Sequence, residues 1–169
     1  GGEGHAATQV TGSADITGDQ FGIVAVAGSI GGDIGGLDPV DPLAWTAGAG
    51  GASVDIVTSG TVTGVSGTGI LALGIGNGGN EVAVDTTGGQ VIGGAGFGIV
   101  AGAIASGVVG SVDVRAGEVT GTAGGVLGFA LGDDARVTVE TSGPVTGDLL
   151  GVGGAVIGEE GDLTLTTYG

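Results

Sequence analysis

Val54-Asp55-Ile56 is an alternating triplet of a kind that recurs along the chain and decides its fold. The other copies are Thr8-Gln9-Val10, Val82-Ala83-Val84, Val112-Asp113-Val114, Val137-Thr138-Val139 and Leu163-Thr164-Leu165. Successive triplets begin 46, 28, 30, 25 and 26 residues apart. Alternation at a period of two residues is typical of a strand with one buried face. The regular spacing therefore predicts a repeat protein built from short β-strands.

Two further landmarks follow the triplets in a fixed order. The first is an aliphatic segment that ends in glycine, as in Val62-Thr63-Gly64, and its other copies are Ile16-Thr17-Gly18, Val91-Ile92-Gly93, Val119-Thr120-Gly121 and Val145-Thr146-Gly147. The second is a run of small and aliphatic residues, as in Gly69-Ile70-Leu71-Ala72, and it returns at 22–25, 98–101, 125–131 and 151–157. Three strands per repeat predict an all-β, right-handed parallel β-helix (β-solenoid) with about five full turns plus a terminal strand.

The need to bury apolar side chains explains why these short segments must stack on one another. A strand of three to five residues cannot bury its own apolar face, whereas coils stacked about 4.8 Å apart form a continuous aliphatic core with paired backbones. The 45 glycines among 169 residues predict left-handed or tight conformations at the corners.

Charged residues test this alignment, because they occupy equivalent positions after or before the triplets. Arg115 is expected between Asp85 and Glu140 on adjacent turns, and Arg136 is expected beside Asp162. Stacked opposite charges stabilise a sheet by about 0.2–1 kcal/mol per pair, so both placements favour the register.

The first turn carries roughly 18 extra residues, which we place as an insertion loop between Gly31 and Gly51 of a single domain spanning 1–169. This loop contains Pro39, Pro42 and Trp45. Proline cannot donate a hydrogen bond to a strand ladder, so the segment is expected to leave the coil. It could contact a neighbouring subunit, meet a receptor, or pack over the coil.

Composition excludes several classes of function. Two arginines, no lysine and 18 acids give a net charge of −16, which is unsuited to binding nucleic acid. The absence of cysteine rules out disulfides and thiolate metal sites. We expect no enzyme, because His5 is the sole histidine and lies among glycines. The uncharged stretch 91–112 holds seven glycines, which makes it a poor helix, so no membrane span is expected.

Two acidic pairs, Asp133-Asp134 and Glu159-Glu160, are separated by one repeat of 26 residues. They should therefore stack on neighbouring turns, where their charges repel unless a cation screens them. One hypothesis is that Ca²⁺ binds there. The alternative is a solvated acidic face that keeps the rod soluble.

The glycine-rich turns, such as Gly60-Thr-Val-Thr-Gly64 followed by Gly67-Thr-Gly-Ile-Leu-Ala72, resemble the passenger regions of bacterial autotransporters and related secreted β-solenoid adhesins. The resemblance covers about residues 8 to 169 and concerns repeat style. It implies a protein that is exported and displayed on a bacterial surface, and it brings no catalytic motif.

The two ends of the predicted rod suggest what it does. No amphipathic capping helix is apparent, and the last strand contains neither lysine nor proline. Open ends favour pairing between copies. The residues expected at this contact are Thr8, Val10, Leu163, Thr164, Leu165, Thr166 and Tyr168. We expect a structural subunit that stacks head to tail into an extracellular filament; the alternative is a segment of a longer adhesin passenger that attaches to a surface receptor.

Overall fold

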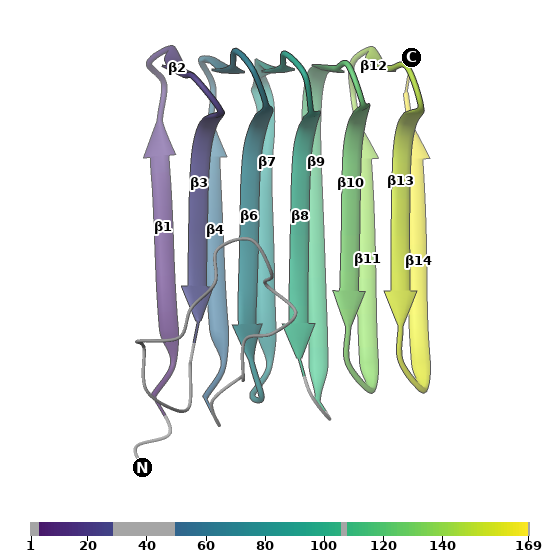
Figure 1. The fold of residues 1–169 in the computed structure, drawn as a ribbon. Coiled ribbons are helices and arrows are strands. Elements are labelled where there is room, and N and C mark those ends of the chain that lie inside the picture. The colour runs from purple at the N-terminus through teal and green to yellow at the C-terminus, as the bar shows by residue number, and fades with distance from the viewer. Residues whose placement is uncertain (1–3, 29–49, 106–107, 169) are drawn as a thin grey trace.

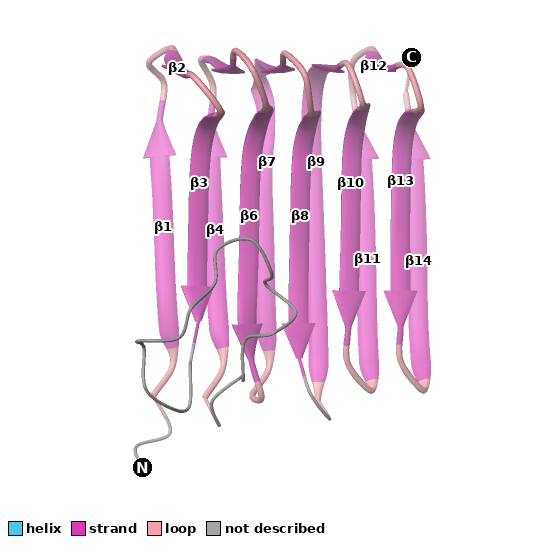
Figure 2. Cartoon of the chain, in the orientation of Figure 1, coloured by secondary structure: helices cyan, strands magenta, loops and turns pink. Residues whose placement is uncertain are grey.

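A computed structural model describes residues 4–28, 50–105 and 108–168. In these ranges the chain consists of fourteen β-strands joined by turns, without a helix (Figure 2). The expected insertion loop, with Pro39, Pro42 and Trp45, lies outside the described residues. None of the described residues belongs to a helix long and apolar enough to cross a membrane.

The strands form two stacked parallel sheets, which we call sheet A and sheet B. The main strands of sheet A are, in spatial order, β1 (Ala6–Gly12), β4 (Ala52–Thr58), β7 (Asn80–Gly93), β9 (Val109–Gly121), β11 (Asp134–Thr141) and β14 (Glu160–Thr167). Sheet B contains β3 (Phe21–Gly28), β6 (Thr68–Gly76), β8 (Phe97–Ala105), β10 (Gly124–Leu131) and β13 (Leu150–Ile157). Short corner strands continue sheet A, namely β2 (Ile16–Gly18), β5 (Thr61–Gly64), β12 (Val145–Gly147) and the ends of β7 and β9.

The coil is right-handed. In Figure 1 the strands of sheet A run upward at the back and those of sheet B run downward at the front, while the chain advances from left to right. Five complete coils are followed by the single strand β14. The predicted fold class and its terminal strand are therefore confirmed.

The register is also the predicted one. Val54 pairs with Val82, which pairs in turn with Val112. Corner and sheet B landmarks align in the same way, for example Val62 with Val91 and Ile70 with Ile99. All three landmarks of each repeat thus lie over their counterparts in the next coil.

The core is an unbroken aliphatic column between the two sheets. Sheet A contributes β-branched side chains such as Val82 and Val112, which are buried. Sheet B contributes small ones such as Ala72, Ala101 and Gly128 in the same column. A Cβ on Gly128 would lie 2.9 Å from Val137 Cγ1. Large side chains on one sheet therefore pack into the space that small residues leave on the other.

The corner glycines were expected in left-handed or tight conformations, and the left-handed part of that expectation is wrong for nearly all of them. Within the described ranges Gly132 is the one glycine with a positive φ, at 155°. The corner glycines are needed for space instead. A Cβ on Gly98 would lie 2.2 Å from Val119 Cγ1 on the next coil, and the same clash with a valine recurs at Gly22, Gly69 and Gly125.

The charged columns have the predicted register but not the predicted contact. Arg115 is in register with Asp85 on one side and with Glu140 on the other. Its guanidinium Nη2, however, lies 3.4 Å from Oδ2 of Asp113 on its own strand. Both side chains are largely exposed, so register alone does not determine which acid the arginine meets.

Candidate assembly interface

Both ends of the solenoid present strands with one unpaired edge. Among the described strands, β1 pairs with β4 alone and β14 with β11 alone. In sheet B, β3 pairs with β6 and β13 pairs with β10. Each terminal strand therefore directs backbone N–H and C=O groups along the axis of the rod, where a further parallel strand could pair with them.

The carboxyl-terminal end exposes side chains whose counterparts in the second to fifth coils are buried core residues. Leu163 and Leu165 are in register with Val137 and Val139. The two leucines are 44% and 42% exposed, whereas the two valines are completely buried. The difference arises because no coil covers β14. The predicted residues Leu163, Thr164, Leu165 and Thr166 thus lie together on this end strand.

Tyr168 follows β14 and is exposed, while its backbone N–H donates to the Thr141 carbonyl over 2.8 Å. This hydrogen bond holds the residue against the fifth coil. Its side chain is exposed, and its part in a contact stays a prediction.

The amino-terminal end holds the other predicted residues, Thr8 and Val10, on β1. Thr8 Oγ1 donates to the Val26 carbonyl over 3.1 Å, which joins β1 to sheet B. Val10 packs against the core and is partly buried. The two predicted halves of the interface therefore lie at opposite ends of the rod (Figure 1), as a head-to-tail contact requires.

The carboxyl-terminal end is stepped. Sheet A has six strands along its main path and sheet B has five, so β14 extends one strand beyond β13. Gly151 marks the recess, because its nearest atom to an added Cβ is Val145 O at 4.0 Å. The equivalent glycines of earlier coils meet a valine of the following coil instead.

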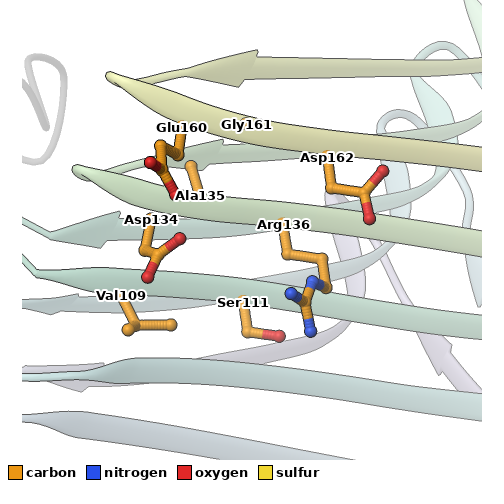
Figure 3. A pocket seen from close by; sticks show the side chains of 8 residues that line it. All are labelled: Val109, Ser111, Asp134, Ala135, Arg136, Glu160, Gly161 and Asp162. Atoms are coloured by element: carbon orange, nitrogen blue, oxygen red, sulfur yellow. The ribbon is translucent and has the colours of Figure 1, made fainter.

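A polar hollow of about 400 Å³ adjoins this end on the outer side of sheet A (Figure 3). It is lined by Val109, Ser111, Asp134, Ala135, Arg136, Glu160, Gly161 and Asp162. Arg136 is in register with Asp162, as predicted. Its guanidinium extends toward Ser111 rather than toward Asp162 (Figure 3), so the carboxylates beside β14 remain unpaired by it.

The four acids suggested as calcium ligands stack as expected. Asp134 is in register with Glu160, and the Glu160 N–H donates to the Asp133 carbonyl over 2.8 Å. With Glu159 they line a smaller hollow of about 290 Å³. Within the described residues, no group of three or more His, Cys, Asp or Glu side chains could hold a metal ion. Calcium binding stays a prediction, which calorimetric titration would check.

One contact near the amino terminus was not anticipated from the sequence. Nε2 of His5 lies 3.2 Å from Ser53 Oγ on the second coil, and both residues are at the surface. A Ser–His pair acts as a nucleophile only when a third group orients the histidine. The described hydrogen bonds place no carboxylate on His5. Here the pair attaches the segment before β1 to the second coil.

Comparisons with protein-family models, with curated proteins and with solved structures found no match for this chain. The class that its structure defines is the parallel β-solenoid.

Proposed function

We propose that the protein is a structural extracellular subunit whose copies join head to tail into a filament, without enzymatic activity. The observation that supports this most strongly is the pair of open sheet edges, with core leucines of β14 left half-exposed. A contact between two different ends does not close on itself, so it propagates into a filament.

Extending the observed register by one coil shows what the contact would bring together. With β14 beside β1 of the next copy, Leu163 would meet Thr8, Leu165 would meet Val10 and Glu160 would meet His5. Leu165 and Val10 thus continue the apolar core, and the acid faces a histidine. A tail-to-tail contact would instead bring two acidic β14 strands together, which like-charge repulsion disfavours.

The step at the carboxyl-terminal end favours a second candidate function. When β14 meets β1 of another copy, sheet B lacks one strand between β13 and the next β3. Further coils of a longer adhesin passenger would fill that recess and bury Gly151 against a valine. In that case the rod would present surfaces to a receptor instead of polymerising. Export to a bacterial surface rests, in both cases, on the resemblance in repeat style.

A pair of variants tests the filament. Leu165→Asp places a carboxylate where the contact is apolar, whereas Thr138→Asp places the same charge on the outer side of β11, away from the residues expected at the contact. We expect wild type and T138D to form elongated polymers, seen by sedimentation and electron microscopy. L165D should remain monomeric at the same concentrations, with circular dichroism showing that its other coils are folded.

Wild-type protein that stays monomeric at every concentration would exclude the filament and favour the passenger segment. Polymers of L165D that match those of wild type would show that β14 is not the contact.

A further inference from the structure

The strands of sheet B have an unusual composition. Across β3, β6, β8, β10 and β13 there is no charged residue, and Thr68 is the only side chain with a hydrogen-bonding group. Strands of parallel sheets that are covered on both faces read as such continuous apolar runs, whereas strands with one wet face alternate. Sheet A alternates and sheet B does not.

The outward side chains of sheet B form a continuous apolar surface. On β10, Val126 and Ala130 point inward and are fully buried, while Leu127, Phe129 and Leu131 point outward and are partly exposed. Their neighbours in register on β8 and β13 are aliphatic or glycine. We define the open apolar face by Val100, Ile104, Leu127, Phe129, Leu131 and Ile157.

This face is level as well as apolar. Phe129 is in register with Gly102, and a Cβ on Gly102 would lie 2.2 Å from the Phe129 ring. Leu150 similarly fills the space above Gly153, where a Cβ would lie 2.4 Å from its Cδ2. Large side chains thus fill the space above neighbouring glycines. A level sheet surface is what face-to-face packing of two sheets requires.

The charge of the molecule lies elsewhere. Outward positions of sheet A carry acids such as Asp55, Asp113 and Glu140, and the net charge is −16. Two copies that approach through sheet A would bring carboxylates together. The described strands of sheet B carry no charge, so repulsion favours an approach through sheet B over one through sheet A.

We infer that the open apolar face packs against the same face of a second copy, as a closed two-fold dimer. Five strands about 4.8 Å apart and about 26 Å long present roughly 600 Å². Leu73 and Ile75 on β6 are already buried, so two faces together offer about 1,000 Å², close to the smallest area of a specific interface. The dimer should therefore form reversibly and depend on concentration.

A matched pair of lysine variants tests the contact. Leu127→Lys puts an ammonium group at the centre of the open apolar face, and Thr138→Lys puts one on the outer side of sheet A, in the middle of β11. The test is made in the L165D background, which removes the end-to-end contact. By sedimentation equilibrium we expect L165D and T138K/L165D to dimerise with the same constant. L127K/L165D should bind itself at least 100-fold more weakly, because an unpaired charge would be buried in the contact.

L165D that does not dimerise, or L127K/L165D that dimerises as well as L165D, would overturn the inference. Dilute monomer should also bind the dye ANS, and absence of dye binding would mean that the chain itself covers the face. Cosedimentation of a monomeric L165D with phosphatidylcholine vesicles would assign the face to lipid instead.

The proposals of a dimer and of a filament can be refuted independently of each other. The face-to-face contact closes at two copies and does not involve Leu165, so L165D should still dimerise. The end-to-end contact grows without limit and does not involve Leu127, so L127K should still form single filaments.

Discussion

At the scale of single residues, two buried polar side chains differ in whether they are hydrogen-bonded. Asn80 is 2% exposed, and its side chain is fully used. Its Oδ1 accepts from the Ala52 N–H, and its Nδ2 donates to the carbonyls of Gly76 and Ile104. Thr86 is equally buried, but its hydroxyl has no hydrogen-bond partner, and the same holds for Thr58 and Thr141.

These two residues predict stability changes of opposite sign. Asn80→Ala would leave three backbone groups without a partner in the interior, and we expect it to lower the free energy of unfolding by about 2–4 kcal/mol. Thr86→Val keeps the shape and removes an unsatisfied hydroxyl, so we expect a gain of about 1 kcal/mol. Chemical denaturation followed by circular dichroism measures both.

Gln9→Ala serves as the control, because the Gln9–Asp55 hydrogen bond is exposed and should matter by less than about 0.5 kcal/mol. A destabilised T86V would contradict the prediction and indicate that an internal water bonds the hydroxyl.

The importance of Asn80 could have been predicted from the residues at the equivalent position of the other coils. The equivalent positions are Ala52, Gly110, Ala135 and Gly161, so an amide at this small, inward position needs partners. The contact of Arg115 with Asp113 could not be predicted in this way. Asp85 and Glu140 on the adjacent strands were equally possible partners of the arginine, and on an exposed surface the side-chain conformation decides which acid it contacts.

At the scale of elements, the corner glycines and valines interlock from coil to coil. In the first four coils, the glycine at the second position of each sheet B strand contacts a valine side chain of the following coil, as Gly98 contacts Val119. This contact fixes how closely the corner of one coil approaches the next. The series of contacts ends at Gly151, because no described coil lies beyond it to supply a valine side chain.

Gly98→Ala and Gly151→Ala therefore make the same chemical change in opposite surroundings. A methyl group at Gly98 would lie 2.2 Å from Val119 Cγ1 and 2.9 Å from the Gly125 carbonyl. We expect G98A to destabilise by about 1–3 kcal/mol through overpacking, whereas G151A should be nearly neutral. Thermal unfolding of the two variants measures the difference.

A second substitution separates the valine contact from the backbone contact. Val119→Ala in the G98A background should recover part of the loss, so that the two changes are not additive. Equal melting temperatures for G98A and G151A would show that the corner can widen freely.

Most of the element-scale architecture could be predicted, because stacked coils repeat the same physical demand at each landmark. Val54, Val82 and Val112 align for that reason. The reason why glycine is required at these corner positions could not be predicted in the same way. The space beside Gly98 depends on how the corners approach, which spacing along the chain does not specify. The run at 98–101 likewise predicted a strand but not its open outer face.

At the scale of the whole molecule, the solenoid has one acidic polar side and one apolar side, with open strands at both ends. The proposed contacts are apolar, and the net charge of −16 opposes both of them. Association is thus a balance between buried aliphatic area and repulsion among acids on sheet A and the turns.

Salt should shift that balance toward association. Between about 0.01 and 1 M salt the Debye length falls from about 30 Å to about 3 Å, which removes most repulsion between exposed carboxylates on different copies. We expect the self-association constant to rise at least tenfold over this range, measured by sedimentation in sodium chloride, and L127K/L165D to stay monomeric. Association that weakens with salt would mean that an attraction between charges dominates, and His5 opposite Glu160 would be the first pair to remove.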